Sequence, residues 1–180
     1  MEMKESNFES RLRDDLTGYL LSQGLLDEQL PQCPDVEDKW KEIGEEYLPD
    51  GIREFSDFPI VSLGWMMFLG MAIANYWDSD WADYGSREHL YVAIRDARGY
   101  DRMDEYILED VLRLDAVARG RLSAAVGECA SRVDGMLRRE PLEPGSPEAF
   151  RAYIYSLRQL YAIGMAMELK RLGYRMAPLN

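Results

Sequence analysis

The side chains best suited to chemistry lie in one short stretch, residues 76–89, which reads YWDSDWADYGSREH. On a helix, the first tyrosine and the last two aspartates of this stretch share one face, and the aromatic rings share the adjoining face. Carboxylates beside rings suit a cation or a sugar, because rings stack on a ligand while acids accept hydrogen bonds or hold a metal ion. The only histidine of the chain, His89, is the last residue of this stretch. The predicted ligand-binding residues are therefore Tyr76, Trp77, Asp80, Trp81, Asp83 and His89.

The same stretch has a simpler interpretation, in which a buried helix reaches the surface with aromatic rings at the boundary and acids in water. It is not an EF-hand loop, because the glycine and the final glutamate are not at the required positions. A di-metal carboxylate bundle needs Glu-x-x-His, and the residue three before His89 is Ser86. The sequence therefore predicts no catalytic residue, no metal ligand set and no cofactor.

The element that positions this stretch is a run of twenty residues without charge, FPIVSLGWMMFLGMAIANYW at 58–77. Twenty apolar residues are enough to cross a bilayer. However, the run contains proline and glycines, and acids flank it on both sides without a cationic cluster. We therefore favour a buried central helix over 58–84, capped by Asp57 and ended by Gly85, and a membrane span is the minority interpretation.

Helical periodicity continues along almost the whole chain, and no segment alternates with period two. Ser6 starts a helix that ends at Gly24. Another starts at Asp35 and ends before Pro49. Further helices begin at Ser86 and at Asp101. The last two helices occupy 122–140 and 147–172, with Ser146 and Pro147 starting the final one. The predicted fold is all-α: one domain over 1–180, with about six to eight helices around the central helix 58–84.

Residues 141–147 contain three prolines and a glycine, which favour a tight reversal inside the domain rather than a domain boundary. The two helices on either side are expected to pack as an antiparallel hairpin, and both are expected to pack on the central helix. The predicted core consists of Ile60, Leu63, Met66, Met67, Leu69, Ile73, Val126, Val133, Ile154, Leu157 and Tyr161.

The chain is acidic, with a formal net charge of −12 over 180 residues. Residues 1–110 hold 10 basic and 26 acidic residues, whereas residues 111–180 hold 11 and 7. An acidic surface repels nucleic acid and anionic lipid, so neither is expected as a partner. The first residues are too polar for a signal peptide, and Cys33 and Cys129 lie far apart without metal-ligand spacing, which indicates free thiols in a reducing cytoplasm.

Two functions follow from these features. The first is a non-enzymatic cytoplasmic helical module that binds a protein partner or itself, since no catalytic motif is present and the separated charge favours complementary docking. Gly70 and Ala74 add a stripe of small residues where helices can approach closely. The second is a protein that binds a small molecule or a metal ion through residues 76–89, with hydrolysis among the reactions it could support. We identify no family motif.

Overall fold

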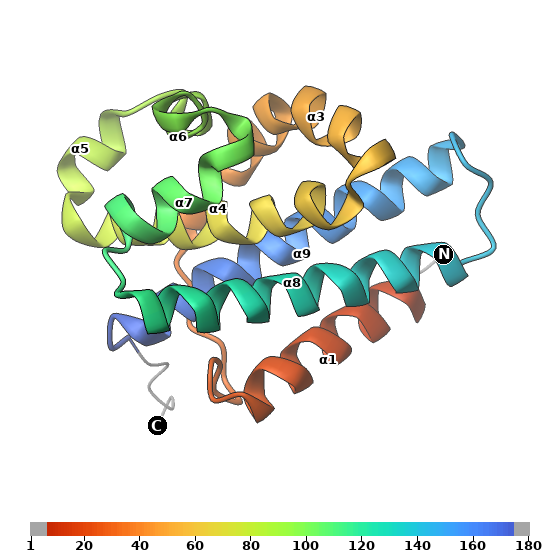
Figure 1. Ribbon diagram of the computed structural model, residues 1–180, viewed down its shortest axis with the longest axis horizontal. Coiled ribbons are helices and arrows are strands. Elements are labelled where there is room, and N and C mark those ends of the chain that lie inside the picture. Colours follow the sequence, from red (N-terminus) through yellow and green to blue (C-terminus); the bar gives the residue numbers. More distant parts are fainter. Residues whose placement is uncertain (1–6, 175–180) are drawn as a thin grey trace.

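A computed structural model describes residues 7–174, and within that range it contains helices and no strand (Figure 1). The all-α prediction is therefore confirmed. A 3₁₀ turn at Tyr100–Arg102 and a π turn at Ile107–Val111 flank α7. The α-helices are α1 (Asn7–Ser22), α2 (Pro34–Glu37), α3 (Trp40–Asp57), α4 (Pro59–Ser79), α5 (Trp81–Ser86), α6 (Leu90–Arg98), α7 (Met103–Tyr106), α8 (Ala116–Arg139) and α9 (Pro147–Arg171).

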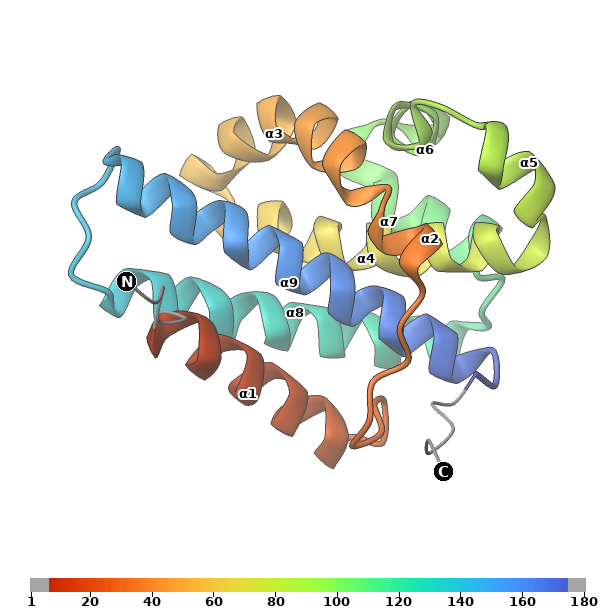
Figure 2. The same ribbon diagram turned by 180° about the vertical axis from the view of Figure 1, so that it is seen from behind.

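Helix α4 lies at the centre of the bundle, between α8 and α9 on one side and α3 on the other (Figures 1 and 2). Its closest neighbour is α9, and two glycines allow this approach. A Cβ atom on Gly70 would lie 2.1 Å from the carbonyl oxygen of Tyr161, and one on Gly164 would lie 2.1 Å from that of Met67. The two backbones are therefore in direct contact. The small-residue stripe predicted for an interface is used inside the chain.

Helix α4 is also the one helix in the described part of the chain that is long and apolar enough to cross a membrane. Within its most apolar window, 67% of the residues are buried inside the protein. Such burial is typical of the core helix of a soluble bundle. The structure therefore favours a core helix over a span, as the sequence indicated.

The final two helices run antiparallel, and their connection turns at Gly145, which has φ 81°. Ser146 caps α9 by accepting a hydrogen bond from the backbone N–H of Ala149, as predicted. Helices α8 and α9 pack mainly on α4 and only slightly on each other. The predicted packing of α8 against α9 is thus mostly replaced by separate contacts of each helix with α4.

The predicted core residues are buried, with two differences. Ile60 is 37% exposed, so its placement in the core was wrong, and Ile154 is only partly buried. Ile60 lies in the first turn of α4, at the edge of the bundle. Cys33 and Cys129 are buried and unpaired, as expected of free thiols.

Several predicted helix boundaries were also wrong, and the single helix predicted from Asp35 is divided into α2 and α3. Helix α3 continues through Pro49 to Asp57, so Asp57 ends one helix instead of capping the next. Pro49 removes a backbone donor, but the buried side chains on either side of it stabilise the helix through tertiary contacts. At the other end, α4 stops at Ser79, because Asp80 leaves helical geometry with φ −155° and ψ 70°.

Local signals elsewhere were met in part. Gly99, with φ 87°, ends α6, whereas Gly85 lies within the short helix α5 and does not terminate the central helix. Ser86 ends α5 rather than starting the next helix. Ser6, the predicted cap of the first helix, lies outside the described residues.

Candidate functional site

The break at Asp80 separates the residues predicted to form one ligand site. Tyr76 and Trp77 stay on α4. The ring of Tyr76 packs 6.0 Å from that of Tyr84, and its hydroxyl is buried without a hydrogen-bond partner. Trp77 donates its indole N–H to Asp35 at 3.2 Å. Both rings thus take part in holding α4 to its neighbours.

The remaining predicted residues of α5 point to local roles. Asp80 caps α5 by accepting the backbone N–H of Asp83 at 3.2 Å, and Asp83 forms an ion pair with Arg87 at 3.2 Å. Trp81 is 73% exposed. The structure does not bring Asp80 and Asp83 together with His89 in a cluster of potential metal ligands. Binding of another ligand at these residues stays a prediction.

His89 instead faces α3, where its partners Glu42 and Glu46 precede it by 47 and 43 residues in the sequence. It has left-handed backbone geometry, with φ 58° and ψ 39°, at the start of α6. Its backbone N–H donates to Glu42 Oε1 at 2.7 Å, and its Nδ1 lies 2.6 Å from Glu46 Oε1. Glu42 and Glu46 are one turn apart on α3, so both carboxylates reach the same residue.

These three residues are the one cluster in the described part of the chain with the composition of a metal site. One ligand atom from each lies within 4.8 Å of the other two. The second carboxylate oxygen of Glu46, Oε2, is buried and has no hydrogen-bond partner. The hydrogen bond to Glu46 also raises the pKa of His89, with the charge of the same carboxylate adding to the effect. The cluster therefore offers two carboxylates and an imidazole, and one acceptor oxygen in it is unused.

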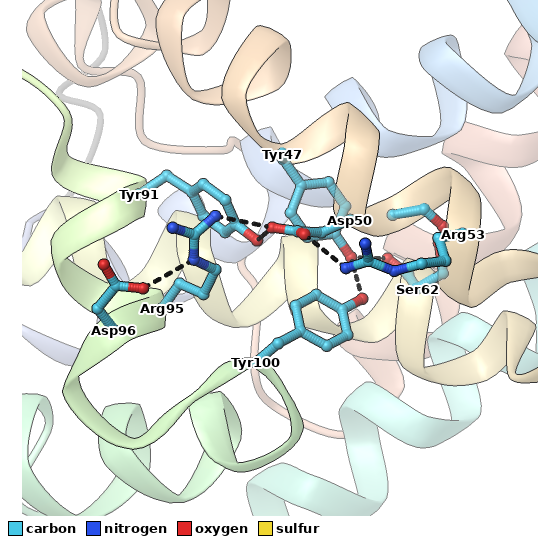
Figure 3. Close-up of polar contacts among 9 residues, drawn as sticks. Tyr47, Asp50, Arg53, Ser62, Tyr91, Arg95, Asp96 and Tyr100 are labelled. Atoms are coloured by element: carbon cyan, nitrogen blue, oxygen red, sulfur yellow. Dashed lines mark hydrogen bonds and ion pairs between the residues drawn. The ribbon is translucent and has the colours of Figure 1, made fainter.

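The next turn of α3 continues the same pattern with Asp50, which is 9% exposed (Figure 3). Tyr91 and Arg95 of α6 donate to its Oδ2 at 2.6 and 3.2 Å, and Arg53 donates to its Oδ1 at 2.8 Å. Burial alone would raise the pKa of Asp50, but the hydrogen bonds from Tyr91 and Arg95 outweigh it and lower that pKa. This carboxylate is fully partnered, so it anchors α6 and is not free to bind a ligand.

A second polar group lies behind Asp50, where tyrosines meet Ser62 of α4. Ser62 donates to the carbonyl of Gly51 at 2.8 Å and lies 2.6 Å from the hydroxyl of Tyr153. The hydroxyl of Tyr47 donates to the carbonyl of Ser62. The hydroxyl of Tyr100 lies 3.1 Å from the hydroxyl of Tyr47. Burial raises the pKa of Tyr153 to about 12. These groups satisfy one another and form a structural layer.

Glu42, Glu46 and Asp50 thus form an acidic stripe at a spacing of four along α3, facing His89, Tyr91 and Arg95. Sequence reasoning missed the stripe because it searched near the histidine in the chain. The available signal was three acids at i, i+4 and i+8 on one face of a helix. Glu45, by contrast, lines a different face, beside Trp40.

The chain matches no protein-family model, no curated protein and no solved structure. Its function must therefore be argued from its own residues.

Proposed function

We propose that this protein binds a divalent cation through Glu42, Glu46 and His89. The observation that carries the proposal is the convergence of three donor side chains, one of which holds a buried oxygen without a partner. An unpaired buried carboxylate oxygen is costly, and a cation would satisfy it. Two elements supply the ligands, since α3 gives both carboxylates and the start of α6 gives the imidazole.

The donor set indicates the class of ion. Carboxylates suit Mg²⁺, Ca²⁺ and Mn²⁺, whereas imidazole suits Zn²⁺ and other transition metals. A mixed set of two carboxylates and one imidazole therefore favours Zn²⁺ or Mn²⁺ over Ca²⁺. Three protein ligands leave room for water, which is the arrangement of catalytic rather than structural zinc sites. The side chain of His89 is 70% exposed, so an ion can reach it from solvent.

Thermal unfolding and calorimetric titration with Zn²⁺ and Mn²⁺ test this proposal. An ion at about a hundred times its dissociation constant adds about 2.7 kcal/mol to the free energy of unfolding. We expect such stabilisation for the wild-type chain, and its loss in His89→Ala and Glu46→Gln. Asp83→Asn is the matched control, because it removes a nearby exposed carboxylate outside the cluster.

The outcomes are distinct. Saturable binding of one ion per chain that both cluster variants abolish and the control retains would support the site. Absence of binding by the wild-type chain would overturn it. Equal loss in Asp83→Asn would show that the ion binds the acidic surface in general, and this too would contradict the proposal.

A second function, the non-enzymatic interaction module, is favoured by a groove between α3 and α9 that we call the Trp40 groove. It has two hollows, of about 230 and 290 Å³, on either side of the Trp40 side chain. Partly exposed tryptophans beside hollows are frequent anchors of protein interfaces. In this proposal the protein works in the cytoplasm without nucleic acid or membrane partners.

A further inference from the structure

The Trp40 groove has an apolar floor and charged edges. The smaller hollow is floored by Leu48, Ile154 and Leu157, and its wall is the ring of Trp40. That ring lies against Gly44, where an added Cβ would come within 3.2 Å of it. Trp40 is thus fixed in place while remaining partly exposed. A fixed aromatic side chain loses little freedom when a partner covers it.

Two opposite charges at its edge are unpaired among residues 7–174. Lys41 and Glu45 are exposed, lie one turn apart on α3, and form no ion pair or hydrogen bond in the described part of the chain. Many of the other cations are paired: Arg95 with Asp50, Arg132 with Asp15, and Lys170 with Asp27. An exposed pair of opposite charges left unused beside a fixed tryptophan is the pattern of an interface edge.

We propose that the Trp40 groove is covered by a second copy of this chain, in a symmetric dimer that places the two α3 helices antiparallel. This inference rests on the interaction function and names its partner. In a two-fold interface, each residue meets the same surface of the other copy. An axis that passes between the two charged positions sets Lys41 of each copy against Glu45 of the other. The pair of opposite charges is therefore complementary to itself.

The same axis brings the two Trp40 side chains near the middle of the interface, because the Trp40 ring packs over Gly44 and position 44 falls between positions 41 and 45 along α3. Aromatic anchors near the centre with charges at the edge match the usual anatomy of interfaces. A partner of a different sequence would need the matching pattern of opposite charges. A second copy supplies this pattern by symmetry.

Sedimentation velocity of the full chain from about 1 μM to about 1 mM tests the dimer. We expect a monomer–dimer equilibrium in the wild type. Glu45→Lys sets two like charges against each other on both sides of the axis, so dimerisation should weaken about tenfold or more. Lys41→Glu should have a similar effect. The combined variant Lys41→Glu, Glu45→Lys exchanges the two charges and should restore the wild-type affinity.

A monomer throughout this range would overturn the dimer, and so would a dimer that Trp40→Ala leaves equally tight. Failure of the charge exchange to rescue would overturn the antiparallel arrangement. The interaction function itself is tested separately by a photo-crosslinking residue at position 48, incorporated in the native cells. Cross-links to another protein that Trp40→Ala abolishes would keep that function while removing the second copy as partner. No cross-link of any kind would remove both.

Circular dichroism and thermal unfolding accompany each variant, because Trp40 also packs 5.6 Å from the ring of Tyr161. The charge variants lie on an exposed face and should unfold like the wild type. A change in sedimentation without a change in unfolding then reports on the interface and not on the fold.

Discussion

The interface of α4 with α9 and that of α3 with α6 join helices by different chemistry. In the first, Gly70 and Gly164 let the backbones touch among buried, mostly apolar side chains, and the polar contacts of Ser62 with Tyr153 and of Asn75 with Glu168 lie nearer its ends. In the second, three acids of α3 receive a histidine, a tyrosine and an arginine from α6. The apolar seam specifies the fold through shape. The polar seam holds α6 through groups that can bind protons and cations, so function is expected there.

The apolar seam should be the harder one to alter. Gly164→Ala places a methyl group 2.1 Å from the carbonyl oxygen of Met67, so α4 and α9 must separate or bend. We expect a loss of about 3 kcal/mol in the free energy of unfolding, measured by urea denaturation.

The matched control is Gly127→Ala on α8, where nothing lies within 4 Å of the added atom. This change should be neutral or stabilising by up to about 1 kcal/mol, because alanine is the better helix former. Equal effects of the two substitutions would contradict the close approach of α4 and α9.

Features set by residues close together in the sequence were predictable, whereas contacts between residues far apart in the sequence were not. Apolar spacing and the run at 58–77 report directly on burial, and the fold class and most of the core were predicted from them. Helix α3 continues through Pro49 because buried side chains on both sides of the proline stabilise it. Helix α4 ends before Asp80 because Asp80 caps the next helix, α5. The acidic stripe could not be assigned from sequence alone, since its partners come from a helix more than 40 residues away.

The polar seam should be most sensitive to its buried carboxylate. Asp50→Asn removes the charge partner of Arg53, leaves Arg95 paired only with Asp96, and weakens the contact with Tyr91, so we expect a loss of about 2 kcal/mol at pH 7. Because the pKa of Asp50 is lower in the folded state than in the unfolded state, its charged form stabilises the protein above the unfolded value of about 3.9.

This contribution is lost as the pH falls through the lower pKa of the folded state. The difference in unfolding free energy between wild type and Asp50→Asn should therefore be constant from about pH 7 to pH 5 and shrink below about pH 4. Urea denaturation at several pH values measures it. A difference that does not change with pH would show that Asp50 acts through packing alone.

The smallest effect is expected at the carboxylates first considered for ligand binding. The double substitution Asp80→Asn, Asp83→Asn keeps a capping side chain at position 80 and removes one exposed ion pair. The free energy of unfolding, measured by thermal unfolding, should fall by no more than about 1 kcal/mol. The response to Zn²⁺ should match that of the wild type. Loss of that response would return the site to residues 76–89.

Native-state hydrogen exchange with and without Zn²⁺ tests the central claim most directly, because it compares the two seams in one experiment. Without the ion, the amides of α6 should exchange through a local opening of lower free energy than those of α4 and α9. Zn²⁺ should slow exchange in α6 of the wild type and leave α6 of His89→Ala unchanged. Amides of α6 that exchange only with global unfolding, or that ignore Zn²⁺ in the wild type, would contradict the account.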